Sequence, residues 1–123
     1  MLEIYSENVT VVANEAVPFN NVSLEKGCTA QLSGASNIQL NKCGVYMVSV
    51  DASAEDPVTL QLYKNGVAQP QAQSTGDAPA FVTLVQVDKN NTCCACSSPV
   101  SLQIISADAG TLTNVNCVIT KIV

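Results

Sequence analysis

Hydrophobic and polar positions alternate with a period of two along most of this chain, most clearly over residues 44–52. One face of that run carries Tyr46, Val48, Val50 and Ala52. This alternation is typical of a strand that packs one face against a core. A turn at 41–44 comes just before, and Gly44 is free to take backbone angles that are closed to other residues. The pattern predicts a central strand of a β-sandwich.

The same pattern predicts short strands on both sides of this run, and no stretch has helical periodicity. Turn signals recur between the strands, so we expect about eight to ten antiparallel strands in a sandwich or jelly roll. No repeat or linker interrupts the pattern, and residues 1–123 are interpreted as one domain. The other expected strands are 2–13, 28–32, 38–40, 58–63, 67–70, 81–87, 100–105 and 114–123, and the longer expected loops are 71–79 and 107–113.

One hairpin is marked with particular clarity. Asn65 and Gly66 stand between two runs that alternate as strands do. Asn-Gly suits a two-residue hairpin turn, because both central residues of that turn need a positive φ. The sequence therefore predicts that residues 58–63 turn back at 65–66 into the strand 67–70.

Two expected strands, 81–87 and 115–123, are apolar on both faces. A two-layer sandwich leaves the outer face of each strand in water. An apolar outer face must therefore be buried against another surface. Contiguous exposed apolar patches usually mark interfaces, and we expect another copy of the chain to cover these faces. The alternative is that a loop of the same chain covers them.

Composition narrows the possible functions. Charged residues make up only 12% of the chain, hydrophobic residues 47%, and the net charge is −5. The five lysines are scattered and arginine is absent, which argues against nucleic-acid binding. No apolar run approaches the ~20 residues of a membrane helix. The first residues lack the features of a secretion signal, so we expect synthesis in the cytoplasm and no membrane partner.

Catalytic and metal chemistry find little support. The chain has no histidine, which removes Ser-His-Asp and Cys-His arrangements and the commonest general base near neutral pH. Asp51, Glu55 and Asp56 cluster near a strand end, but a Ca²⁺ site needs about six to eight oxygens. We interpret these carboxylates as a solvated loop. The sequence predicts no enzyme, no metal and no cofactor.

The six cysteines leave three interpretations open. Thiolates bind zinc or copper, but no Cys-x-x-Cys pair or histidine completes a structural zinc site. An even count allows up to three disulfides, although cytoplasmic synthesis disfavours early oxidation. The third interpretation is buried free thiols that act as small hydrophobes. The cysteines are Cys28, Cys43, Cys93, Cys94, Cys96 and Cys117.

A family resemblance runs through most of the chain. The order of three motifs is similar to that of the TNF/C1q-like jelly-roll superfamily, in particular its short bacterial and phage members. Those members occur in virion proteins and at the ends of collagen-like proteins of spore formers. The motifs are Ile38-x-Leu40-x-x-x-Gly44-x-Tyr46-x-Val48-x-Val50, then Val58-x-Leu60-x-Leu62-x-x-Asn65-Gly66, then Asn114-x-Asn116-x-Val118-x-Thr120-Lys121-Ile122.

The resemblance implies a compact homotrimer that is displayed on a particle or cell surface. The chain lacks a collagen-like stem and has only 4% aromatic residues, which is low for a cytokine-type receptor binder. These departures favour a virion surface protein (capsid decoration, head fibre or fibre head) with capsid or other virion proteins as partners. The alternatives are a trimeric module that recognises a host glycan or receptor through the expected loops 71–79 and 107–113, and a protein of a spore or cell-surface layer. The residues expected in the packed core or threefold interface are Tyr46, Val48, Val50, Phe81, Val85, Val87, Val115, Cys117, Ile119 and Ile122.

Overall fold

The computed structural model describes residues 1–27, 29–88 and 100–123. These residues form eleven β-strands. Within the described ranges there is no helix, and so none that is long and apolar enough to cross a membrane. The all-β sandwich predicted from the sequence is confirmed.

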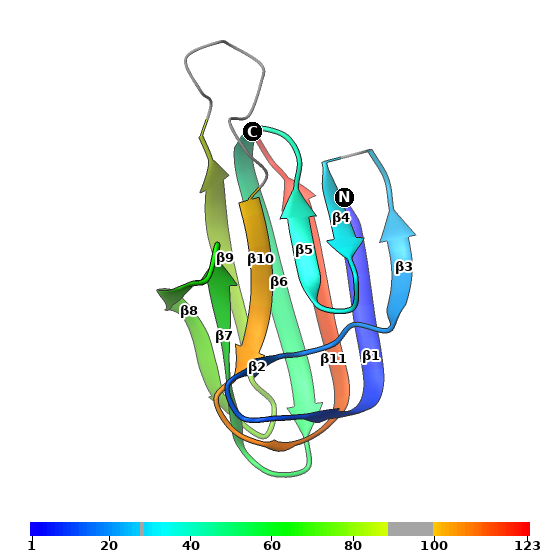
Figure 1. Cartoon of the computed structure of the whole chain (residues 1–123), viewed down its shortest axis with the longest axis vertical. Coiled ribbons are helices and arrows are strands. Elements are labelled where there is room, and N and C mark those ends of the chain that lie inside the picture. The colour runs from blue at the N-terminus through cyan, green and yellow to red at the C-terminus, as the bar shows by residue number, and fades with distance from the viewer. Residues whose placement is uncertain (28, 89–99) are drawn as a thin grey trace.

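One layer of the sandwich is a five-stranded antiparallel sheet, here called sheet A (Figure 1). Its strand order is β3-β1-β11-β6-β9, so the predicted central strand lies inside the sheet, between β11 and β9. The cross-strand partners of β6 include Ile119↔Val48 and Val50↔Phe81. The strands are β1 (Leu2–Val11), β3 (Asn21–Glu25), β6 (Gly44–Ala54), β9 (Ala80–Val87) and β11 (Gly110–Lys121).

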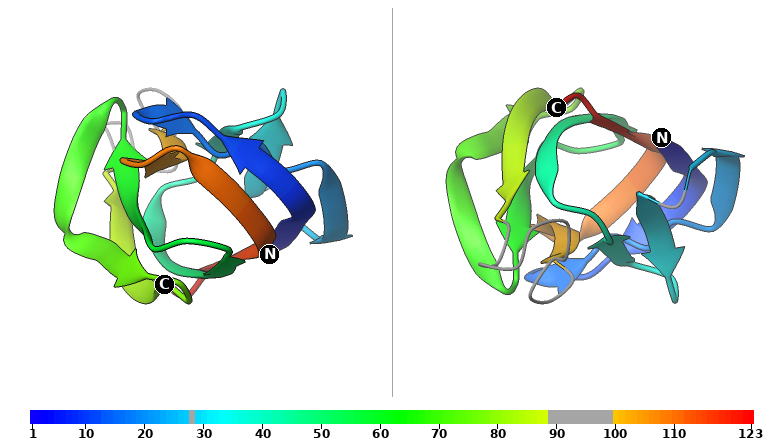
Figure 2. Two further views of the ribbon diagram at one scale, coloured as in Figure 1. Left: turned by 90° about the horizontal axis from the view of Figure 1, so that it is seen from below. Right: turned by 90° about the horizontal axis from the view of Figure 1, so that it is seen from above.

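The second layer, sheet B, has the strand order β4-β5-β10-β7-β8, and a short strand β2 also pairs with β10. Views along the strands show the two sheets enclosing the space between them (Figure 2). The predicted turn at 41–44 therefore joins strands of different sheets, β5 and β6, instead of closing a hairpin. The strands are β2 (Glu15–Ala16), β4 (Ala30–Ser33), β5 (Asn37–Leu40), β7 (Val58–Lys64), β8 (Val67–Gly76) and β10 (Val100–Ser106).

A single hydrophobic core fills the space between the sheets, and it contains nine of the ten residues expected in the core or interface. Burial of these aliphatic and aromatic side chains is the main force that holds the two layers together. Ile122 is the exception, because its side chain is 48% exposed. The nine buried residues are Tyr46, Val48, Val50, Phe81, Val85, Val87, Val115, Cys117 and Ile119.

Tyr46 is fully buried, and its hydroxyl has partners inside the protein. The hydroxyl donates to the carbonyl oxygen of Lys42 at 2.7 Å and lies 3.3 Å from the carbonyl oxygen of Thr29. We expect Tyr46→Phe to lower the free energy of unfolding by about 1–2 kcal/mol, because it leaves partly buried carbonyl groups without this donor. Urea denaturation measures the change. Tyr63→Phe is the matched control, since Tyr63 is only half-buried, and an equal loss there would contradict the role of the Tyr46 hydroxyl.

The hairpin predicted at Asn65 and Gly66 is confirmed. Both residues have positive φ, 51° and 80°, and the turn joins β7 to β8. The return strand is longer than expected, because β8 continues to Gly76. The prediction of a loop over 71–79 is therefore wrong for residues 71–76. Likewise β11 begins at Gly110, so the loop expected over 107–113 is limited to 107–109.

The first strand also departs from the simple pattern. Its buried positions are even-numbered up to Ser6 and odd-numbered from Val9 onward. Asn8 lies at the change with a φ of 50°, and such a local kink moves the following side chains to the opposite face. The strand ends at Val11, two residues earlier than expected. Ser6 is the last of the buried even-numbered residues. Its hydroxyl accepts from the amide of Asn20 and donates to the carbonyl oxygen of Pro18, both at 2.8 Å.

Candidate functional site

The outer face of sheet A, which points away from the core, is the candidate functional surface. Along β9 the side chains alternate strictly, and Phe81, Thr83, Val85 and Val87 point into the core. Val82 and Leu84 point outward and are 62% and 58% exposed. The sequence-based prediction that this strand has two apolar faces is confirmed.

Four outward side chains from three neighbouring strands lie together as an apolar patch. Met47 of β6 is paired with Leu84 of β9, and Ser49 of β6 is paired with both Val82 of β9 and Val118 of β11. Cross-strand partners and their diagonal neighbours lie within side-chain reach. We define the apolar patch as Met47, Val82, Leu84 and Val118.

The other half of the same face is polar and hollow. A basin of about 400 Å³ lies over β1, β3, β6 and β11, and cross-strand pairing brings Tyr5 opposite Asn116 and Glu7 opposite Asn114. Ser23 donates to a carboxylate oxygen of Glu3 at 2.6 Å. We define the polar basin by its lining residues Glu3, Tyr5, Glu7, Ser23, Asp51, Asn114 and Asn116.

The basin offers hydrogen-bonding groups around one aromatic ring. Its carboxylates accept hydrogen bonds, its amides donate and accept, and the phenol of Tyr5 does both. Sequence reasoning instead expected recognition at loops 71–79 and 107–113. It missed the basin because Glu3, Asp51 and Asn116 come from three strands that are distant in the sequence, and only the strand order of sheet A brings them together.

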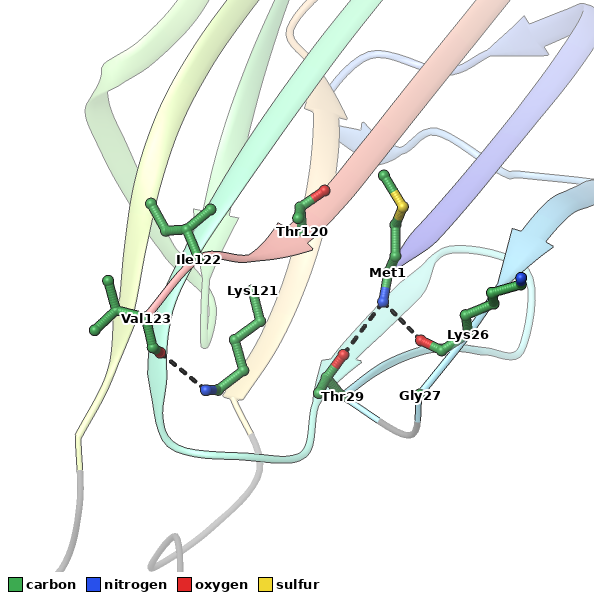
Figure 3. A pocket seen from close by; sticks show the side chains of 8 residues that line it. All are labelled: Met1, Lys26, Gly27, Thr29, Thr120, Lys121, Ile122 and Val123. Atoms are coloured by element: carbon green, nitrogen blue, oxygen red, sulfur yellow. Dashed lines mark hydrogen bonds between the residues drawn. The ribbon is translucent and has the colours of Figure 1, made fainter.

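A second hollow, of about 440 Å³, lies at the end of the sandwich where β1 begins and β11 ends (Figure 3). The Met1 nitrogen donates to the carbonyl oxygen of Lys26 at 2.7 Å, and Lys121 Nζ donates to the carbonyl oxygen of Val123 at 2.9 Å. Ile122, expected in the core or interface, is not a core residue and lines this hollow. The lining residues are Met1, Lys26, Gly27, Thr29, Thr120, Lys121, Ile122 and Val123.

Two of the six cysteines fall within the described residues. Cys117 is buried in the core and Cys43 is half-buried, and both are free thiols. Among the described residues, no three or more Cys, Asp or Glu side chains are placed to hold a metal ion. The other four cysteines, and the cysteine-rich run among them, lie outside the described residues. They are Cys28, Cys93, Cys94 and Cys96.

Burial raises the pKa of the Cys117 thiol from 9.0 to about 12, and the charge of Asp51 adds to the shift. Between these values the unfolded thiol has lost its proton while the folded thiol retains it. Stability should therefore fall as the pH rises through this range, by ~1.4 kcal/mol per pH unit from this group. Urea denaturation at several alkaline pH values measures the slope. Cys117→Ala lacks the titrating group, so an identical slope in that variant would contradict the prediction.

Comparison with known proteins identifies the fold. The chain is similar to the globular domain of the zebrafish complement 1qA protein, with a TM-score of 0.75, 14% identity, and coverage of 99% of this chain and 96% of that one. It is also similar to rabbit GITRL, with a TM-score of 0.63, 11% identity, and coverage of 100% and 95%. No family model matches the sequence. No curated relative matches it either. The described strands thus form a TNF/C1q-like jelly roll.

Proposed function

We propose that this chain is a non-enzymatic structural protein that assembles as a homotrimer and is displayed on the surface of a phage virion, as a capsid decoration or head fibre. The apolar patch carries the proposal of self-assembly. Its two most exposed members, Val82 and Leu84, stand side by side on the edge strand of sheet A. Exposed apolar side chains on a sheet edge favour association, and three copies around an axis bury each patch equally.

The virion surface is supported by the resemblance of the strand motifs to short phage and bacterial jelly rolls. It is also supported by the sparse charge and the missing histidine, which suit a packing role better than catalysis. Imaging of native particles, with this chain placed in the density, tests the proposal. We expect surface densities in groups of three. Purified particles that lack the chain would contradict the virion role and favour a spore or cell-surface layer.

The polar basin favours a second candidate, a trimeric binding module for a host glycan. The basin places the Tyr5 ring among carboxylates and amides, which can accept from and donate to ligand hydroxyl groups. A glycan array separates the two candidates. Binding that is lost in Tyr5→Ala and kept in Tyr63→Ala, a tyrosine of sheet B, would establish the binding module. Absence of binding to every glycan would leave the structural role.

A further inference from the structure

Charged side chains are sorted to opposite ends of the sandwich. All four lysines of the described residues lie toward the end where β1 begins and β11 ends, because each stands beside a strand terminus that points to this end. Figure 1 shows both chain termini at the same end. Five exposed carboxylates lie at the opposite end, four in connections between strands and one, Glu15, in the short strand β2. We call the first the lysine end (Lys26, Lys42, Lys64 and Lys121) and the second the acid end (Glu15, Glu55, Asp56, Asp77 and Asp108).

The acid end is a built surface held by hydrogen bonds between its loops. The amide of Ala54 donates to the carbonyl oxygen of Asp77 at 2.8 Å, which joins the β6–β7 and β8–β9 connections. The amide of Thr59 donates to a carboxylate oxygen of Asp108 at 3.0 Å. Near β2, the amide of Asn14 donates to the carbonyl oxygen of Ser106 at 2.7 Å. Two of these bonds join the backbones of neighbouring loops, and the third holds the carboxylate of Asp108. No described lysine lies among the five carboxylates.

The lysine end has the complementary charge. Two carboxylates, Glu25 and Asp88, share this end with the four lysines, so its described side chains are positive on balance. Its hollow of about 440 Å³ is lined by Lys26 and Lys121 (Figure 3). The two ends therefore match each other in charge, and one of them is concave.

We infer that the acid end of one copy docks onto the lysine end of the next, head to tail. Opposite charges attract when two such molecules meet end to end. A contact between two different surfaces leaves one of each free on every pair, and because these surfaces lie at opposite ends of the sandwich it repeats as an open stack. The inference goes beyond the proposed function, because the stack uses the ends of the sandwich and leaves the apolar patch of sheet A untouched.

Sedimentation velocity of the whole chain at two salt concentrations tests the contact. Near 20 mM salt we expect the sedimentation coefficient to rise with protein concentration, and near 0.5 M we expect the rise to disappear, because salt screens exposed charges beyond a Debye length of ~8 Å or less. A rise that persists at high salt, or no rise at low salt, would overturn the inference.

Neutral substitutions assign the effect to the acid end. The triple variant Glu55→Gln, Asp56→Asn, Asp77→Asn should weaken the low-salt association about tenfold or more, since each exposed pair contributes up to ~1 kcal/mol. The triple variant Ser33→Lys, Gln71→Lys, Gln73→Lys changes the net charge equally at exposed positions of sheet B, and it should keep the association. Equal loss in both variants would show a net-charge effect and overturn the inference.

Charge reversal supplies a positive test. Glu55→Lys, Asp56→Lys, Asp77→Lys makes both ends of the chain basic, and Lys26→Glu, Lys42→Glu, Lys121→Glu makes both ends acidic. Each variant alone should lose the low-salt association, and an equimolar mixture should recover it. Failure of the mixture, with both variants folded by circular dichroism, would overturn the head-to-tail contact.

The two proposals fail in different ways. If the stack is wrong, the particle mass stays constant between low and high salt, whatever the size of the assembly. If the trimer is wrong, growth at low salt starts from one chain of 12.8 kDa instead of three.

Discussion

The double variant Val82→Glu, Leu84→Glu is expected to convert the assembly into folded single chains. Both side chains point outward from β9 and are 62% and 58% exposed, so a single chain tolerates the change. In a trimer that buries the apolar patch, each copy would place two unpaired carboxylates in an apolar contact. Leaving one such charge unpaired costs ~3–5 kcal/mol, so two in each copy should raise the dissociation constant at least ~1000-fold. Light scattering after size-exclusion chromatography measures the mass.

Val67→Glu is the matched control for this variant. Val67 is an equally exposed valine, at 63%, but it lies on β8 of sheet B. We expect Val67→Glu to keep the mass of the unaltered protein. Loss of assembly in the control, or an intact trimer in the double variant, would move the interface away from the apolar patch.

The second large effect is expected at Gly44, where β6 begins beside the end of β11. Gly44 has a φ of 144°, and a Cβ there would press on the carbonyl oxygen of Val123 and come within 2.7 Å of Lys121 Cε. The next residue, Val45, accepts from the amide of Ile122 at 2.8 Å, so the backbone has little room to shift. We expect Gly44→Ala to lower the free energy of unfolding by roughly 2–4 kcal/mol, since backbone strain alone costs about 1–3 kcal/mol. Thermal and urea unfolding both report the loss.

Gly66→Ala separates crowding from backbone strain. Gly66 also has a positive φ, 80°, but nothing lies within 4 Å of the place where a Cβ would stand. Its substitution should cost only about 1–2 kcal/mol, from the left-handed backbone alone. Equal losses at the two glycines would show that the close approach of the chain end to Gly44 does not matter for stability.

Strong alternation made the inner strands predictable from the sequence. Residues 44–52, 58–63 and 100–105 each place a large apolar residue at every second position, and each lies inside its sheet with that face buried. The edges of the sheets carry little of this signal. Strand β3 at the edge of sheet A has no fully buried residue, and the second half of β8 buries only Ala72, so small polar residues there resembled a loop.

The sequence predicted less of the candidate site than of the fold. Two apolar faces along 81–87 were enough to predict an exposed patch on β9, and the structure places Val82 and Leu84 there. Most of the residues expected in the core or interface are core residues. The sequence could not separate these two groups, because period-two alternation identifies a face of a strand but does not tell which face is inner. The polar basin and the charge-sorted ends depend on strand order across sheet A and on loops at one end, which local pattern does not encode.

Threefold burial of the apolar patch is the claim on which this account depends, and sedimentation equilibrium of the unaltered chain tests it most directly. At micromolar concentration and about 0.5 M salt, where end-to-end attraction is screened, we expect one species with three times the 12.8 kDa mass of a single chain. A lone 12.8 kDa species under the same conditions, with Val82 and Leu84 left in water, would contradict it.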